Sequence, residues 1–127
     1  MFVHIDHVDG AGHKFGHGSE KYYEGVALAD ELIGKIVAAT EAAFMKEETL
    51  IIVSADHGGK GTGHGGESLG EVEIPVLLCG PGVRKGFEIS DATNIFDIAS
   101  TVAYVFGYEQ PHAWIGRPIV SAFEDTE

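Results

Sequence analysis

The chain has 127 residues, of which 44% are hydrophobic and 22% charged, and its formal net charge is -12. Its length and composition are those of a single ordinary globular domain. The acidic balance argues against a nucleic-acid-binding or anionic-membrane surface, since both need Lys and Arg to displace counterions.

The first predicted elements are a strand, a loop and a long helix. Residues 1–6 (MFVHID) have the pattern of a strand, and they lead into a Gly/His-rich loop over residues 7–18. Ser19 is a suitable N-cap for a helix that continues to about Met45, because apolar residues recur there at helical spacing. Since a domain rarely opens on a core strand, we expect further sequence to precede this one.

The rest of the chain alternates in the same way. Residues 50–54 form a continuous apolar run typical of a strand covered on both faces, and residues 74–79 form the next strand. Thr93 or Asn94 caps a second predicted helix, which Gly107 ends. Strand–helix–strand order with buried strands predicts an α/β fold, specifically an α/β/α sandwich with a largely parallel sheet.

Two short motifs combine Asp and His with glycine. DGAGH runs from Asp9 to His13 after the first predicted strand, and DHGG begins at Asp56 and His57 after the second and leads to His64. In this fold class, sites form just past the carboxyl ends of strands. Asp9, His13 and His64 therefore predict a three-ligand metal site with an open position. Asp56 and His57 are predicted to contribute to a second ion about 4 Å away, as in two-metal phosphoryl chemistry.

The remaining polar candidates are weaker. His4 is interpreted as a sheet-face residue and His112 as a surface residue. His7 and His17 lie near enough in sequence to orient a ligand, but an exposed loop position is the favoured interpretation. Lys60 is a weak candidate for binding an anionic substrate. Cys79 is the only cysteine, which excludes an internal disulfide and a cysteine-based metal site.

The sequence also contains a match to the dinucleotide-binding fingerprint. Residues 61–66 (GTGHGG) match Gly-x-Gly-x-x-Gly. That motif should begin directly at a strand end and open into a helix, whereas here Asp56 and His57 intervene and another strand follows. The dinucleotide interpretation is therefore disfavoured.

At these residues the chain resembles the alkaline phosphatase superfamily, most closely its branch of type I phosphodiesterases and nucleotide pyrophosphatases. The segments that carry the resemblance are HVDGAGH (7–13), ADELIG (29–34), SADHGG (54–59), GHG (63–65), IPV (74–76), GPG (80–82) and DIASTV (97–102). The resemblance implies that Asp9, His13 and His64 bind one divalent ion and that Asp56 and His57 bind the other. In most such enzymes the ions are zinc, with manganese or other divalent ions in some branches.

The resemblance also implies parts that this chain does not supply. The family uses a Ser or Thr nucleophile and a further metal-binding Asp, both from a segment before the part seen here, and Thr62 is not expected to replace the nucleophile. We therefore expect residues 1–127 to form one partial domain, the C-terminal portion of the catalytic domain. His64 follows His57 more closely than in nucleotide pyrophosphatases, so sulfatase-like and phosphoglycerate-mutase-like relatives stay open.

The predicted function is metal-dependent hydrolysis of a small phosphate mono- or diester by the parent domain, with the isolated chain weak or inactive. Two alternatives are a non-catalytic metal-binding module and an interaction domain whose exposed sheet edge pairs with a second copy. No stretch has the length and apolarity of a membrane span, and the N-terminus is not a signal peptide. The compartment stays open, either exported or cytoplasmic.

Overall fold

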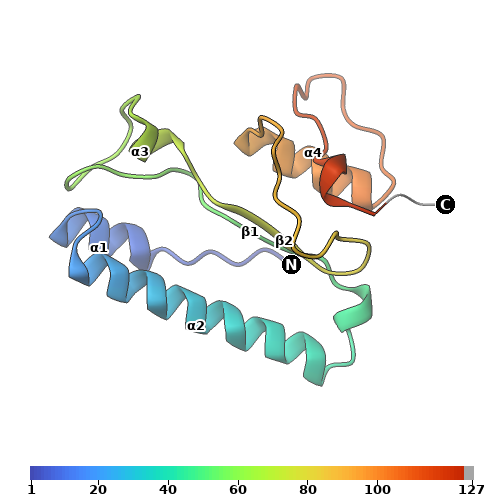
Figure 1. The fold of residues 1–127 in the computed structure, drawn as a ribbon, viewed down its shortest axis with the longest axis horizontal. Coiled ribbons are helices and arrows are strands. Elements are labelled where there is room, and N and C mark those ends of the chain that lie inside the picture. The colour runs from blue at the N-terminus through green and yellow to red at the C-terminus, as the bar shows by residue number, and fades with distance from the viewer. Residues whose placement is uncertain (125–127) are drawn as a thin grey trace. The chain divides into compact units, whose positions relative to one another are not determined.

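A computed structural model describes residues 1–124 of the chain. The chain divides into two compact units, Met1–Leu77 and a second unit that begins at Leu78, and each is described by itself. Both combine helices with strand segments (Figure 1). The mixed α/β character that the sequence predicts is therefore confirmed, while the prediction of one domain over the whole chain stays a prediction.

Two helices dominate the first unit. α1 spans His7–Phe15 and α2 spans Glu20–Ala42. The turn between them uses Gly16 and Gly18, whose φ values of 94° and 80° lie in the left-handed region that glycine adopts without steric cost. The Ser19 side chain accepts a hydrogen bond from the backbone of α2 in its first turn, which confirms the predicted N-cap.

The two helices pack against each other where a glycine allows it (Figure 1). A Cβ placed on Gly25 of α2 would lie 3.5 Å from the Cβ of Ala11 on α1. Beside this contact, His7 Nε2 lies 3.0 Å from the Gly25 carbonyl oxygen. The small residues therefore set the distance between the helices, and His7 ties their backbones together.

The structure corrects the prediction for the N-terminal segment. Residues 1–6 form no strand, and Met1 and Phe2 are exposed. A strand needs a hydrogen-bonded neighbour, and the described chain supplies none there. The predicted loop over residues 7–18 is mostly helix α1. Its glycines lower helix propensity, so the local pattern favoured a loop, but packing against α2 outweighs that preference.

The sheet has two strands, β1 (Ile51–Ser54) and β2 (Val76–Cys79). They run antiparallel, so that the Ser54 hydroxyl, at the end of β1, donates to the Pro75 carbonyl, just before β2, at 2.9 Å (Figure 1). Both strands were predicted, but the largely parallel sheet is not what these two strands form. A parallel connection needs a crossover, usually a helix, and the connecting segment contains only the one-turn helix α3 (Leu69–Val72).

Helix α4 (Ile95–Val105) organises the second unit. Its N-terminus carries a capping box between Asn94 and Asp97, and the other Asp97 oxygen accepts from the Arg117 backbone N–H at 2.7 Å. The Thr101 hydroxyl accepts from the Ile119 backbone N–H at 3.0 Å. Because Asp97 and Thr101 are buried, these bonds hold the following segment onto the helix.

Two short 3₁₀ turns are also present, η1 (Lys46–Glu48) and η2 (Val120–Ala122).

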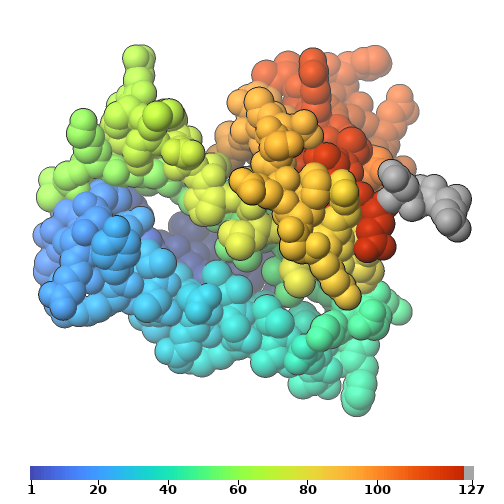
Figure 2. Space-filling model, viewed as in Figure 1, coloured from blue at the N-terminus to red at the C-terminus, as the bar shows by residue number. Residues whose placement is uncertain are grey.

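The buried apolar side chains among the described residues are few and lie in the second unit: Ala103, Ile119 and Ala122. Within residues 1–77, all of which are described, only Gly12 is buried. Figure 2 shows the loop that follows β1 lying alongside the N-terminal helical segment, to which it is joined by the hydrogen bond from the His17 backbone N–H to the Gly61 carbonyl. No helix in the described range is both long and apolar enough to cross a membrane.

We expect the buried Asp97 carboxylate to be a main support of the second unit. Asp97→Ala would leave the Asn94 and Arg117 N–H groups without their acceptor and should lower the free energy of unfolding by roughly 2 kcal/mol. The matched control is Asp91→Ala, which removes an exposed carboxylate and should change that free energy by less than about 0.5 kcal/mol. Urea denaturation measures both, and equal effects would contradict this role of Asp97.

Candidate metal centre

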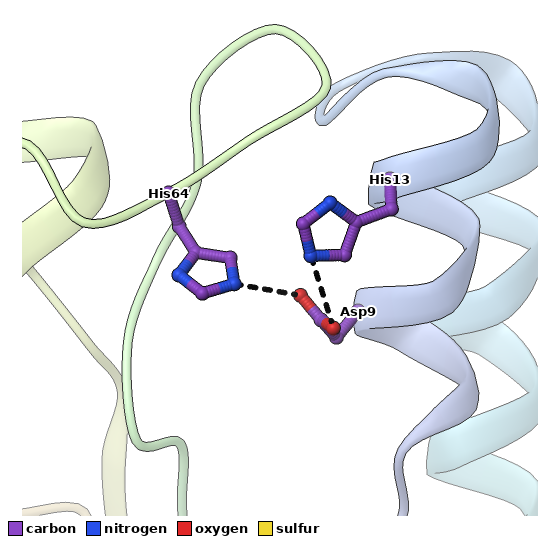
Figure 3. Close-up of side chains that lie close together, drawn as sticks. All are labelled: Asp9, His13 and His64. Atoms are coloured by element: carbon purple, nitrogen blue, oxygen red, sulfur yellow. Dashed lines mark ion pairs between the residues drawn. The ribbon is translucent and has the colours of Figure 1, made fainter.

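Three of the predicted ligands converge in the first unit. Asp9 and His13 lie one turn apart on α1, a spacing that places both side chains on the same helix face. His64 reaches them from the loop after β1 (Figure 3). Asp9 Oδ2 lies 3.4 Å from His13 Nε2, and Asp9 Oδ1 lies 3.8 Å from His64 Nε2. One ligand atom from each residue falls within 4.8 Å of the others.

The chemistry of this cluster fits a cation. Asp9 Oδ1 is buried and has no hydrogen-bond partner, an arrangement that costs free energy unless a positive charge compensates it. Nitrogen and oxygen ligands about 2.1 Å from a tetrahedral zinc ion are about 3.4 Å apart, which compares with 3.4 Å from Asp9 Oδ2 to His13 Nε2 and 3.8 Å from Asp9 Oδ1 to His64 Nε2. The side chains of Asp9 and His13 are 42% and 45% exposed, which leaves access for a further ligand.

A backbone carbonyl orients His13. His13 Nδ1 lies 2.9 Å from the Thr62 carbonyl oxygen. A carbonyl only accepts, so the proton is assigned to Nδ1 and the lone pair to Nε2. Nε2 is the atom that faces Asp9, so the tautomer suited to metal binding is selected by the loop.

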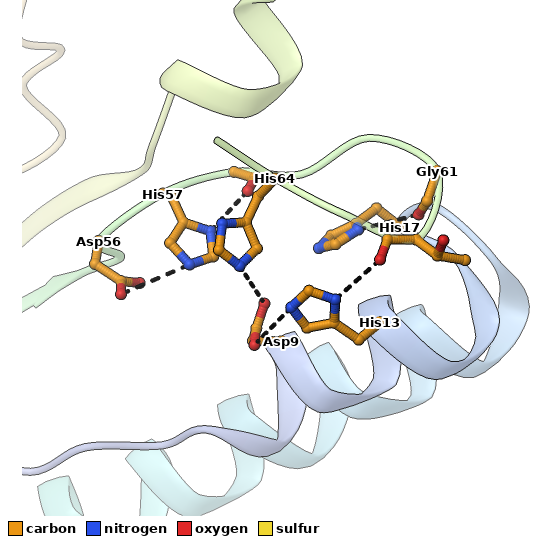
Figure 4. Close-up of polar contacts among 9 residues, drawn as sticks. Asp9, His13, His17, Asp56, His57, Gly61 and His64 are labelled. Atoms are coloured by element: carbon orange, nitrogen blue, oxygen red, sulfur yellow. Dashed lines mark hydrogen bonds and ion pairs between the residues drawn. The ribbon is translucent and has the colours of Figure 1, made fainter. Parts of the chain in front are cut away.

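The second predicted pair lies next to the first cluster. The His57 ring stacks on His64, with ring centroids 3.7 Å apart and an interplanar angle of 19°. His57 Nε2 lies 3.7 Å from Asp56 Oδ2, and His57 Nδ1 bonds the Gly58 carbonyl at 2.8 Å. Figure 4 shows all five predicted ligands in one neighbourhood. Asp56 and His57 are nevertheless outside the three-residue cluster, and the Asp56 side chain is 81% exposed.

The loop that carries His57 and His64 is folded by its own backbone. The N–H groups of Gly58 and Gly59 donate to the carbonyls of Glu71 and Gly70 at 2.8 and 2.7 Å. A Cβ on Gly58 would overlap the Gly70 carbonyl oxygen, so the close approach of the two segments requires glycine. Lys60 pairs with Gly63 in a tight turn and is exposed; its contact with a substrate stays a prediction.

Comparison with known proteins shows the family of the chain. The family model of type I phosphodiesterases and nucleotide pyrophosphatases matches residues 1–71. The chain belongs to this family. All five predicted ligands, from Asp9 to His64, lie inside the matched range. This match confirms the predicted resemblance to the alkaline phosphatase superfamily.

Curated relatives have several different names. The chain is 36% identical to a phosphopentomutase of Edwardsiella ictaluri over 103 residues, 81% of this chain and 24% of the relative. It is 29% identical to arylsulfatase K of Danio rerio over 104 residues, 78% of this chain and 20% of the relative. It is 26% identical to GPI ethanolamine phosphate transferase 1 of Saccharomyces cerevisiae over 146 aligned positions, 100% of this chain and 16% of the relative. No solved structure matches the chain.

This phosphodiesterase-family chain thus spans about a fifth of the length of its relatives, from 16% to 24% in these three. A mutase, a sulfatase and a phosphate transferase share the similarity, so similarity alone does not select a substrate.

The four other histidines of the chain agree only in part with expectation. His7 and His17 are half-buried instead of exposed, and His4 is exposed without any sheet around it. His112 is exposed, as predicted. The Thr62 carbonyl was missed because side-chain identity carries no information on which backbone group turns inward. For His17 the sequence did contain a signal, namely the glycines, because a ring can lie directly against backbone only where the neighbouring residues have no Cβ atom.

Glu71 anchors the His64 loop and predicts a pH effect. Hydrogen bonds from the Ser68 hydroxyl and from the Gly66 backbone N–H lower the pKa of Glu71. A lowered pKa means that the ionised form stabilises the fold above the ordinary Glu pKa, and that this contribution is lost as pH falls through the lowered value. An NMR titration of the carboxyl carbon should show the lowered pKa in the wild type and a higher one in Ser68→Ala. Identical titrations would contradict the anchoring role.

Proposed function

We propose that the parent protein hydrolyses phosphate mono- or diesters at a divalent metal centre to which this chain contributes most of the ligands. The observation that carries the proposal is the Asp9 carboxylate, whose buried Oδ1 has no hydrogen-bond partner and lies 3.8 Å from His64 Nε2, while its Oδ2 lies 3.4 Å from His13 Nε2. Membership of the type I phosphodiesterase family supports it. A sulfatase or mutase activity at the same centre is the alternative, favoured by the names of the relatives.

In this proposal Asp9, His13 and His64 hold the first ion, and Asp56 with His57 holds the second more weakly. The donor set of imidazole nitrogen and carboxylate oxygen suits zinc, with manganese as the alternative. Such ions polarise the ester oxygens and stabilise the attacking and leaving oxygens. The weakness of the second position follows from the exposure of Asp56.

In this proposal the residues of the chain also orient the metal ligands and balance the positive charge of the ion. Asp9 supplies negative charge beside the two imidazole ligands, and the Thr62 carbonyl holds the proton of His13 Nδ1 away from the centre. Lys60 is proposed to meet the anionic ester. We also propose that the attacking Ser or Thr, and the remaining strands of an α/β/α sandwich with a largely parallel sheet, belong to a longer polypeptide, because the relatives are several times longer than the matched region.

Metal binding should depend on Asp9. We expect the 127-residue chain, purified without chelator, to bind about one equivalent of zinc tightly, with isothermal titration calorimetry as the measurement. Asp9→Ala removes the only charged ligand of the three and should raise the zinc Kd by roughly 100-fold or more, beyond the ~10–100-fold typical for an outer partner.

The matched control is Asp30→Ala on α2, which removes an exposed carboxylate of the same charge and should leave the Kd within about twofold. Equal zinc affinity in the wild type and Asp9→Ala would sink the metal proposal. A repeat with manganese tests the identity of the ion, because a site with two imidazoles should bind zinc more tightly than manganese.

Turnover by the isolated chain should be slow or undetectable, because we propose that the nucleophile lies elsewhere. The assay is release of nitrophenol from nitrophenyl phosphate and from bis(nitrophenyl) phosphate with added zinc. Rapid hydrolysis that His64→Ala abolishes and His112→Ala preserves would show that the chain is catalytically complete. Tight zinc binding without turnover, even beside the N-terminal part of a relative's domain, would favour the metal-binding module.

A further inference from the structure

His17 occupies a slot between the two segments that build the candidate metal centre. A Cβ placed on Gly12 of α1 or on Gly59 of the loop would overlap the His17 ring. Gly12 is also the only buried residue within residues 1–77. The ring therefore lies against bare backbone on both segments, in a space that only two glycines provide.

Two hydrogen bonds fasten this ring to the loop. The His17 backbone N–H donates to the Gly61 carbonyl at 2.7 Å, and His17 Nδ1 lies 3.1 Å from the same oxygen. The next carbonyl along the chain, that of Thr62, bonds His13 Nδ1 (Figure 4). Consecutive carbonyls of the loop are thus attached to the last turn of α1, through His13, and to the connection that follows it, through His17. Tyr22 packs on the other ring edge, with centroids 5.3 Å apart.

This attachment matters because the cluster is assembled from two separate segments. Asp9 and His13 come from α1, whereas His64 lies three residues beyond Gly61 on the loop. A shift of the loop along α1 would separate His64 from Asp9 and also remove the acceptor that selects the His13 tautomer.

We propose that His17 is the positioning residue of the metal centre: its ring, locked between Gly12 and Gly59, sets the register of the His64 loop on α1. The inference rests on the proposed metal function. His17 is not a ligand itself, since it lies outside the three-residue cluster, its Nδ1 faces the Gly61 carbonyl, and its ring centroid is 6.2 Å from that of His13.

The first test compares His17→Ala with His7→Ala in the 127-residue chain. His7 also joins α1 to a neighbouring backbone, but its hydrogen bond goes to the Gly25 carbonyl of α2 and not to the loop. Both variants should lower the Tm. Only His17→Ala should weaken zinc binding, by about 10- to 100-fold, and change the visible spectrum of the cobalt(II)-substituted protein, which reports ligand geometry. A merely structural role predicts the same zinc affinity and the same spectrum for both variants.

A second readout needs no metal. In the metal-free wild type, ¹⁵N NMR of the imidazoles should show His13 protonated at Nδ1. His17→Ala should give a mixture of His13 tautomers, and His7→Ala should not. If the wild type binds no divalent metal, the proposed function fails, and this comparison still decides whether His17 positions the loop. An unchanged His13 tautomer in His17→Ala would overturn the inference even if zinc binds.

The glycine slot provides a matched pair of variants. Gly59→Ala should expel the ring and give the same zinc affinity as His17→Ala. The affinity of the double variant should lie within about twofold of that of either single variant, because the two substitutions remove the same interaction. Gly63→Ala is the control, since a Cβ there meets nothing within 4 Å and its φ is not positive. His17→Asn keeps a donor for the Gly61 carbonyl and should recover part of the affinity. Additive losses in the double variant, or no recovery in His17→Asn, would contradict the mechanism.

Discussion

The feature on which the candidate centre depends is the attachment of one glycine-rich loop to helix α1. Three contacts made by two histidines on two successive carbonyls, those of Gly61 and Thr62, bring the segments together. Ligands from one segment alone would be too few, since α1 supplies Asp9 and His13 and the loop supplies His64. The glycines follow from this requirement, because backbone must approach backbone and a ring must fit between them.

Few residues of the first unit are buried beneath this loop and helix. Residues 1–77 bury only Gly12 fully, and the two helices meet at Gly25. Little apolar area therefore holds the loop, and much of the order around the site comes from hydrogen bonds, each of modest net value in exposed surroundings. A bound ion would add a further connection between α1 and the loop, so that metal binding and the stability of the first unit should be thermodynamically linked.

The candidate metal ligands could be predicted from the sequence, whereas the backbone contacts that hold them in place could not. Asp and His beside glycine, each motif placed after a predicted strand, led to Asp9, His13 and His64, which do converge, and the strand at residues 51–54 and the capped helix at 95–105 were recognised from their apolar patterns. The backbone acceptors for His13 and His17 could not be recognised, because every residue offers a carbonyl and only the fold decides which ones turn inward. The direction of the two strands was also missed, since apolar runs look alike in either orientation.

The error at α1 is the most informative of these. DGAGH carries two glycines in five residues and was taken for a loop on propensity alone. As a loop, it would leave Asp9 and His13 free to diverge. As a helix, it fixes them one turn apart on one face, with Asp9 in the first turn, where the helix dipole favours a negative charge, and His13 in the last turn. One of the glycines, Gly12, also supplies the floor on which His17 lies. Gly12, which weakens the helix, is therefore also the residue that lets it join the loop, and local propensity is overridden where the site is built.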